Sequence, residues 1–194
     1  MSSINCVLLN NSIGDISGFT NLTYDSIGDY IQYCVDNGFL PDINIIPLVP
    51  KMTSATTPSG VVTSSGNDSN NPSWLPYKAF NEDIIEGWWS NIGTNSYISY
   101  QSVRPICVKK ISVQSVFEGN TIRLKNFKLQ GSNNGSNWTD IYTGVYKNND
   151  NLQKFSFAND NFYSYHRLYC IDTYATSTGF SIVIKNLQFY GQTS

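Results

Sequence analysis

The chain contains 194 residues, of which 13% are charged and 14% aromatic, and its formal net charge is −2. The charged fraction is about half of that usual in globular domains, and uncharged Asn, Ser and Thr fill the polar share, with 23 Asn in total. A near-neutral chain without a basic run argues against binding to a nucleic-acid backbone, and no apolar run approaches the ~20 residues of a membrane span.

Residues 1–50 differ in pattern from the rest of the chain. A short strand is expected at Ile4–Leu9, and apolar residues at helical spacing predict a helix over Ser26–Asn37, with Gly38 as its stop. A helix of this length is marginal alone, so it must pack either on the rest of the chain or on another subunit. The proline-rich stretch PDINIIPLVPKM that follows predicts an extended linker.

The chain beyond residue 50 reads as a loop or irregular edge over Thr53–Pro72 and then as β-structure from Ser73. Alternation in Ile106–Val113 slips at Lys109-Lys110, which predicts a β-bulge. The tightest turn signal is Ser132–Gly135, because Asn-Gly favours the positive φ angles of a hairpin. Residues that share one face of a strand are Phe127, Leu129 and Gly131, then Phe155 and Phe157, and last Phe180, Ile182 and Ile184. Tyr163–Ile171 is a further strand-like run. Short strands between Asn/Gly turns predict an antiparallel sandwich or barrel.

The titratable residues limit the chemistry. A single histidine, His166, excludes a multi-histidine metal site and leaves one imidazole base. The cysteines Cys6, Cys34, Cys107 and Cys170 show no C-x-x-C spacing. The N-terminus lacks the basic and apolar regions of a signal peptide, so we expect a reducing cytosol and unpaired thiols.

Four motifs of the β part occur in the order of one known family. YKAFNEDIIEGWWSN (77–91) resembles the opening signature of discoidin domains, also called coagulation-factor C-type domains, and KNFKLQGSNNGSNWTDIYTG (125–144) is similar to their hairpin. YSYHRLYCI (163–171) and IKNLQFYG (184–191) resemble two further strands of that family. The resemblance implies an all-β, antiparallel jelly-roll β-sandwich within 51–194 and leaves the segment 1–50 unexplained.

The same resemblance suggests which side chains hold the fold and which meet ligand. The motif residues expected in the core or at corners are Phe80, Trp89, Phe127, Leu129, Trp138, Arg167 and Phe189. Sugars bind at the loops of one end, against aromatic faces flanked by amide, hydroxyl or Arg donors. The candidate ligand-binding residues outside the core positions are Trp74, Trp88, Tyr97, Arg104, Phe117 and Tyr174.

Trp88 is the most specific of these candidates. If Trp89 satisfies the motif and lies in the core, Trp88 points outward, because neighbours on a strand face opposite sides. An outward Trp88 could serve as a ligand platform, cover the base of a loop, or contact another subunit.

Catalysis is not expected. A Ser-His-Asp triad would need His166, which lies in a predicted strand, and no G-x-S-x-G elbow or phosphate loop occurs. The carboxylates Glu82, Asp83 and Glu86, which a glycosidase would need in a cleft, lie in one loop and are predicted to be solvated charges.

Calcium is the one cofactor that the resemblance implies. Sugar-binding modules of this type often hold a structural Ca²⁺ beside the Ala-Phe-Asp loop, with a glutamate from the closing strand. The matching positions here are Asn81 and Asn186, with Asp83 or Glu82 as compensating carboxylates. Ca²⁺ prefers several oxygen ligands with negative charge, so two amides weaken the site.

The predicted setting is a bacteriophage particle, made in the host cytoplasm. Asn-rich, low-charge composition and the lead-in PLVPKMTSATTPSGVV resemble phage tail, baseplate or head-fibre proteins. On this hypothesis, residues 1–50 dock onto other virion proteins or form a homo-oligomer, and the sandwich binds host cell-surface glycans. The alternatives are a cytosolic discoidin-type lectin and a virion decoration or adaptor protein without ligand.

Overall fold

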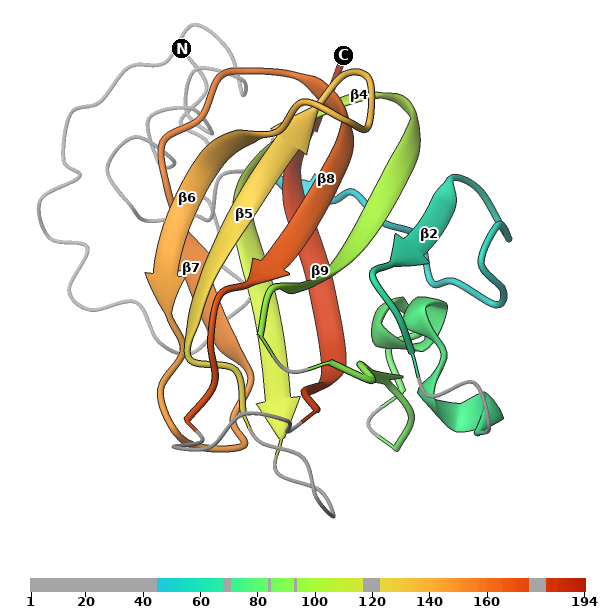
Figure 1. Ribbon diagram of the computed structural model, residues 1–194. Helices are drawn as coiled ribbons and strands as arrows, with labels where there is room; N and C mark the ends of the chain where they lie inside the picture. Colours follow the sequence, from blue (N-terminus) through green and yellow to red (C-terminus); the bar gives the residue numbers. More distant parts are fainter. Residues whose placement is uncertain (1–44, 68–70, 84, 93, 117–122, 175–180) are drawn as a thin grey trace, which may run out of the picture. The chain divides into compact units, whose positions relative to one another are not determined.

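The structure is a computed structural model that describes residues 45–67, 71–83, 85–92, 94–116, 123–174 and 181–194 (Figure 1). The strand and helix predicted before residue 44 lie outside these residues. Contacts divide the chain into Met1–Ile43 and a compact unit, Asn44–Ser194, to which the description below refers. Within the described part, no helix has the length and apolar character needed to cross a membrane.

The described residues form an almost entirely β structure, which confirms the predicted fold class. The only helical pieces among them are the 3-10 turns η2 (Pro72–Trp74) and η3 (Pro76–Phe80), each opened by a proline. The strands are β1 (Ile46–Pro47), β2 (Val61–Ser64), β3 (Trp88–Trp89), β4 (Ser96–Val116), β5 (Asn126–Ser132), β6 (Thr139–Val145), β7 (Gln153–Ser156), β8 (Tyr163–Cys170) and β9 (Val183–Thr193).

The strand β4 belongs to both layers of the sandwich. Its first part, Ser96–Gln101, pairs with β2 and β8, and β8 continues to β5 and β6. Its second part, Ile106–Val116, pairs with β9 and β7, and β9 also carries β1 and β3. A register shift between Gln101 and Ile106 lets the strand pass from one layer to the other. Figure 1 shows β5, β6 and β8 lying in front of β9.

The core lies between these layers, where the predicted inward faces meet. Phe127 and Leu129 of β5 are fully buried and face Ile111 of β4 and Phe189 of β9 within one cluster. Phe155 of β7 closes the gap, with its ring 5.0 Å from that of Phe127 in an edge-on contact. Period-two alternation was therefore sufficient to identify the inner faces of these strands.

The predicted bulge and turn are both confirmed, the turn in modified form. The register of the pairing between β4 and β9 shifts between Val108 and Lys110. In the β5–β6 connection Gly135 has a φ of 70°, but the connection spans residues 133–138 instead of two residues. The Ser132 hydroxyl accepts the Gly135 backbone N–H at 3.0 Å and so holds the longer loop.

The described part of the proline-rich stretch, residues 45–52, packs against the sandwich instead of forming the predicted extended linker. Val49 and Met52 are buried in the core. The Gln188 side chain accepts the Val49 N–H at 3.2 Å and donates to the Val49 carbonyl at 2.9 Å, so one amide satisfies both backbone groups. The compact unit consequently begins at Asn44, before the boundary predicted at residue 50.

Candidate functional site

Several strand ends meet at one end of the sandwich, which is called the loop end here. Val116 at the end of β4 pairs with Val183 at the start of β9, and Trp89 of β3 pairs with the same Val183. Asn126 at the start of β5 pairs with Val145 at the end of β6. Antiparallel order therefore brings side chains that are far apart in the sequence to one end, the lower end in Figure 1.

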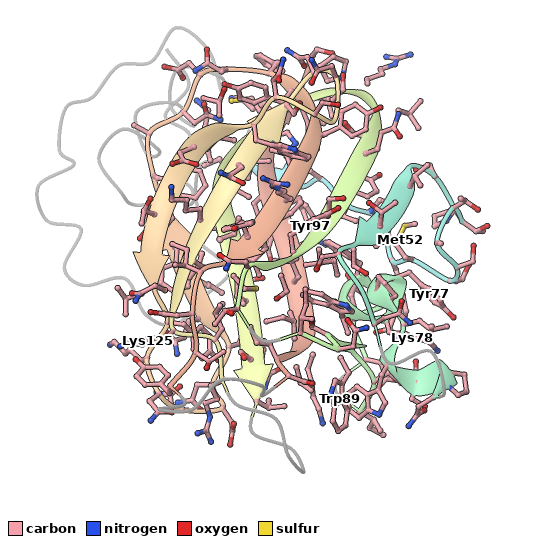
Figure 2. All side chains as sticks on the ribbon, viewed as in Figure 1. Met52, Tyr77, Lys78, Trp89, Tyr97 and Lys125 are labelled. Atoms are coloured by element: carbon pink, nitrogen blue, oxygen red, sulfur yellow. The ribbon has the colours of Figure 1, made fainter. Side chains whose placement is uncertain are left out.

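A tryptophan pair forms one part of the loop end. The rings of Trp74 and Trp89 meet edge-on, with centroids 5.5 Å apart and planes at 75°. Val116 and Val183 pack beneath them in a small cluster separate from the main core. Trp74 is only 7% exposed, whereas Trp89 is half-buried and is labelled at this end in Figure 2. Trp89 is thus the ring of the pair that is available to solvent.

The predicted orientation of Trp88 and Trp89 is wrong. Trp88 is fully buried, and its indole N–H donates to the Gly66 carbonyl at 2.9 Å. The reason is the pairing with β9: Trp88 stands opposite Ile184 of the main core, and Trp89 stands opposite Val183 of the small cluster. Because paired residues share a face, β9 determines which tryptophan points inward. A fully buried Trp88 offers no ligand platform.

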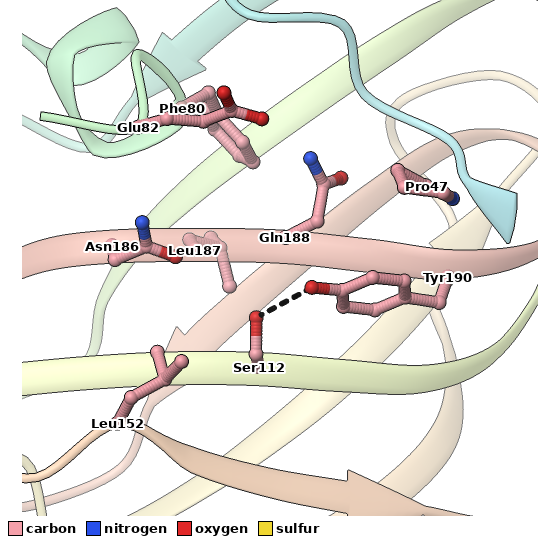
Figure 3. Close-up of a pocket in the computed structure, with 9 residues that line it drawn as sticks. All are labelled: Pro47, Phe80, Glu82, Ser112, Leu152, Asn186, Leu187, Gln188 and Tyr190. Atoms are coloured by element: carbon pink, nitrogen blue, oxygen red, sulfur yellow. Dashed lines mark hydrogen bonds between the residues drawn. The ribbon is translucent and has the colours of Figure 1, made fainter. Parts of the chain in front are cut away.

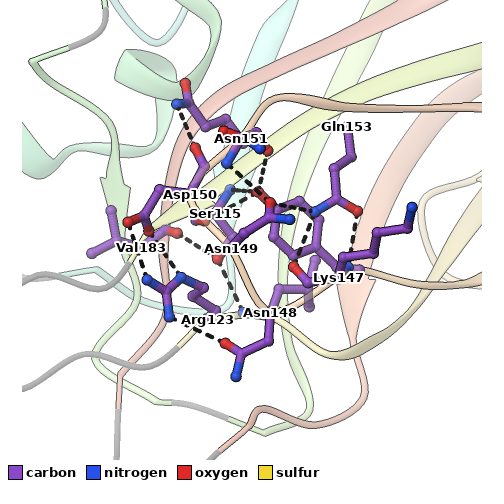
Figure 4. Close-up of polar contacts among 12 residues, drawn as sticks. Ser115, Arg123, Lys147, Asn148, Asn149, Asp150, Asn151, Gln153 and Val183 are labelled. Atoms are coloured by element: carbon purple, nitrogen blue, oxygen red, sulfur yellow. Dashed lines mark hydrogen bonds and ion pairs between the residues drawn. The ribbon is translucent and has the colours of Figure 1, made fainter.

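A polar loop forms the other part of the loop end (Figure 4). The Asp150 carboxylate accepts Nε and Nη2 of Arg123 at 2.8 and 3.0 Å, and the Asn148 side chain accepts Nη1 at 3.1 Å. A two-point Arg–carboxylate pair of this kind fixes geometry as well as charge. Asn149 accepts the Asn151 N–H and a Gln153 amide N–H, both at 3.1 Å. The loop therefore presents ordered amide groups at the surface.

Tyr146 anchors this loop to the core. Its side chain is fully buried, and its hydroxyl accepts the Ser115 N–H at 3.1 Å and donates to the Asn151 carbonyl at 2.6 Å. Burial raises the pKa of Tyr146, because the phenolate would be desolvated. The Ser115 hydroxyl in turn donates to the Val183 carbonyl at 2.9 Å, which links the polar loop to the strand beneath the tryptophan pair.

Among the predicted ligand-binding residues that the structure describes, Trp74 and Tyr174 lie at the loop end. The Tyr174 hydroxyl donates to the Tyr146 carbonyl at 2.7 Å. Tyr97 lies on the outer face of a sheet, and exposed Arg104 lies in the bend of β4 near the opposite end. Phe117 falls outside the described residues.

Sequence reasoning missed the residues that organise the loop end. Trp89 was assigned to the core, and Arg123 with the run Asn148–Asp150 was not considered. The sequence did contain a signal for the polar loop, since KNNDN falls between two predicted strands and such Asn-rich connections favour ordered turns.

A pocket of about 220 Å³ lies over β9 and β4 (Figure 3). Asn186 and Tyr190 of β9, Ser112 of β4, Glu82 and Leu152 contribute to its wall. The Tyr190 and Ser112 hydroxyls are 3.4 Å apart across the two strands. The pocket therefore combines a carboxylate, amides and the partly exposed Tyr190 ring on a strand face.

The residues proposed for calcium do not fit a calcium site. Oδ1 of Asn81 accepts the Asp83 N–H at 2.8 Å, and its Nδ2 donates to Glu86 at 2.8 Å. Glu86 also pairs with the Lys78 ammonium at 2.5 Å, a hydrogen bond that raises the pKa of Lys78. Asn186 instead contributes to the pocket wall, and no group of three or more His, Cys, Asp or Glu gathers within the described part. An internal ammonium thus supplies the positive charge to this loop.

The histidine offers no catalytic base. The His166 side chain is 0% exposed, and neither of its ring nitrogens has a hydrogen-bond partner. Burial lowers its pKa to about 3. A triad built on this residue is therefore incompatible with the structure. Among the described cysteines, Cys107 and Cys170 are free and buried, and burial raises the pKa of Cys170 to about 12.

Comparison with known proteins identifies the domain type. The family model of the F5/8 type C domain matches residues 61–184. A search of the curated proteins finds no match. The fold is similar to that of the family 32 CBM of Clostridium perfringens NanJ in complex with galactose, with 14% identity and a TM-score of 0.56, covering 68% of this chain and 93% of that one.

Two further solved structures have the same fold. Chitosan-binding module 1 of a Paenibacillus sp. IK-5 chitosanase/glucanase is 16% identical, with a TM-score of 0.58 over 75% of this chain and 99% of that one. The Clostridium perfringens module CpGH89CBM32-5, in complex with GalNAc-β-1,3-galactose, is 13% identical, with a TM-score of 0.58 over 67% of this chain and 94% of that one. At these identities the likeness concerns the fold.

Proposed function

The chain belongs to the F5/8 type C domain family, and on this basis we propose that it is a non-catalytic carbohydrate-binding module that contacts glycans with its loop end. The observation that carries this proposal is the partly exposed Trp89 ring, held edge-on by Trp74 at the same end as the ordered amides of residues 148–151. The modules of similar fold that were solved with galactose and with GalNAc-β-1,3-galactose support it.

Such a site binds through stacking and neutral hydrogen bonds. The apolar face of a pyranose lies against an aromatic ring, and amide groups orient its hydroxyls. Sugar hydroxyls exchange water for protein partners at small net gain, so we expect dissociation constants of roughly 0.1–1 mM per site, or about 4–5.5 kcal/mol. Many copies on one particle would then provide adhesion through effective concentration.

Replacing Trp89 by Ala is expected to weaken glycan binding by about tenfold or more, because the stacking surface is lost. The glycan is first selected on an array, and its affinity is then measured by calorimetry. The matched control is Phe162→Ala, which removes an exposed aromatic ring (38% exposed) outside the loop end and should leave affinity unchanged. Binding should vary little between roughly 50 and 500 mM salt. Equal affinity of the two variants would contradict a loop-end site.

We also propose a setting for this module: a phage particle, to which the N-terminal segment of residues 1–43 attaches it, with the loop end presented to host-surface glycans. The Asn-rich, low-charge composition supports this setting. Deletion of residues 1–43 should leave a folded, monomeric module, because Asn44–Ser194 is compact by itself. Light scattering of the full chain and the deletion variant tests this expectation.

The outcomes separate the alternatives. Loss of assembly on deletion, with glycan binding retained, supports attachment through the N-terminal segment. If the full chain forms an oligomer but is not found in phage particles, the cytosolic lectin would be favoured. A full chain found in particles but binding no glycan would favour a decoration protein.

A further inference from the structure

The outer face of the layer formed by β4, β8 and β5 carries a cluster of one arginine and three aromatic rings, which is separate from the loop end. The guanidinium carbon of Arg167 on β8 lies 4.1 Å from the ring centroid of Trp138, 5.0 Å from that of Tyr97 and 5.1 Å from that of Tyr169. These four residues are called the sheet-face cluster here. All four are partly exposed, and Tyr97 is labelled on this face in Figure 2.

Arg167 is held firmly but has no counter-ion. Its Nε donates to Oε1 of Gln130 at 2.7 Å. It takes part in none of the ion pairs among the described residues, and its terminal amino groups donate no hydrogen bond to them. Within the same residues, the only buried side-chain nitrogen or oxygen atoms without a partner are those of His166. The terminal amino groups of Arg167 therefore reach solvent.

The carboxylate that acts electrostatically on Arg167, that of Asp140, is already committed to other groups. Asp140 accepts the Gln130 amide at 2.5 Å and the Lys128 ammonium at 2.6 Å. The hydrogen bond from Lys128 lowers the pKa of Asp140, which keeps it ionised and paired. The Lys128–Asp140 pair is neutral overall, so the Arg167 charge remains in excess on this face.

A partly buried cation without an ion-pair partner is unusual, because burial of a charge is costly when it is not paired. Burial lowers the pKa of Arg167 for this reason. The fork of the guanidinium edge matches a carboxylate in geometry, and the flanking Tyr97 and Trp138 rings can lie against the apolar face of a sugar.

We propose that the sheet-face cluster is a second glycan site, which binds a carboxylate-bearing sugar residue such as a uronic acid through Arg167, Tyr97 and Trp138. It goes beyond the proposed function, because the loop end is expected to bind neutral glycans. The two sites share no residue, so either one can fail without the other.

The test compares galacturonic acid with galactose, which differ at C6 only by carboxylate against hydroxymethyl. Each is titrated into the ¹⁵N-labelled full chain, and the Trp138 indole N–H signal, assigned with Trp138→Phe, reports on the site. We expect galacturonic acid to shift this signal with at least tenfold higher affinity than galactose, and to bind more weakly in 500 mM salt.

Two variants distinguish a binding role of Arg167 from a structural one. Arg167→Lys keeps the charge but loses the fork, and should reduce affinity for galacturonic acid about tenfold. Asp140→Asn removes the competing negative charge at an exposed position, and should raise affinity about threefold. Trp89→Ala should leave galacturonic acid binding unchanged, which separates this site from the loop end.

Three results would overturn the proposal. They are equal Trp138 shifts with galactose and galacturonic acid, unchanged or reduced affinity in Asp140→Asn, and displacement of galacturonic acid by equimolar inorganic phosphate. The last result would mean that the cluster recognises charge alone.

Discussion

Replacing Trp88 by Ala is expected to lower the free energy of unfolding by about 3–5 kcal/mol. Trp88 is the largest fully buried side chain of the described residues, so its loss leaves a cavity that the surrounding core can only partly fill. The Gly66 carbonyl would also lose the indole N–H that it accepts at 2.9 Å. Denaturant unfolding followed by circular dichroism measures the difference.

Trp89→Ala provides the matched comparison, because it removes the same side chain from the adjacent position. Trp89 is half-buried in the small cluster with Trp74, so its removal should cost clearly less, roughly 1–2 kcal/mol. A larger loss of stability in Trp89→Ala than in Trp88→Ala would mean that the assigned orientation of this strand is incorrect.

Acid should destabilise the protein through His166. Its pKa is about 3 in the folded chain and about 6.5 when unfolded, so between these values the unfolded chain binds a proton that the folded chain does not. The contribution of His166 to the free energy of unfolding is therefore fully present above pH 6.5. Below pH 6.5 it falls by up to about 1.4 kcal/mol per pH unit, until about pH 3. At pH 4.5 the expected loss is roughly 2–3 kcal/mol.

His166→Phe isolates this contribution from that of the carboxylates. The His166 ring already lies among aromatic rings, 5.9 Å from Tyr163 and 6.0 Å from Phe189, so Phe suits the site and binds no proton. Urea midpoints are measured at pH 7, 5.5 and 4.5. The stability of the variant should fall less steeply as the pH decreases, and the difference in slope should correspond to about one proton fewer taken up on unfolding. Parallel pH profiles of the two proteins would show that His166 does not titrate on unfolding.

The fold could be predicted from the sequence because most of its strands are long enough to show their own alternation. Phe127 and Leu129 define an inner face by themselves, and the slip at Lys109 defines a bulge. The two-residue strand Trp88–Trp89 has no internal period, so its orientation is set by β9, almost a hundred positions away. The packing of Val49 on Gln188 is equally long-range, 139 residues apart, whereas the prolines of this stretch by themselves suggested an extended linker.

The candidate sites were harder to predict, since each is assembled by pairing. Arg123 meets Asp150 only because the ends of β4, β5 and β6 converge. Tyr97 was identified as a ligand residue, and Arg167 as a corner residue, without any relation between them. The register of β4 with β8 places Tyr97 opposite Tyr169, beside Arg167, and so creates the sheet-face cluster.

The pairing of β1 with β9 determines how this module can be joined to other proteins. Ile46 lies opposite Gly191, and the Ser194 N–H donates to the Pro105 carbonyl at 3.2 Å, so the chain enters and leaves the sandwich at the same end. That end is opposite to the one where Val116 pairs with Val183. A fusion partner, affinity tag or surface tether at Ser194 would therefore lie at the end opposite to the loop end, and modules immobilised through it would present the loop end outward.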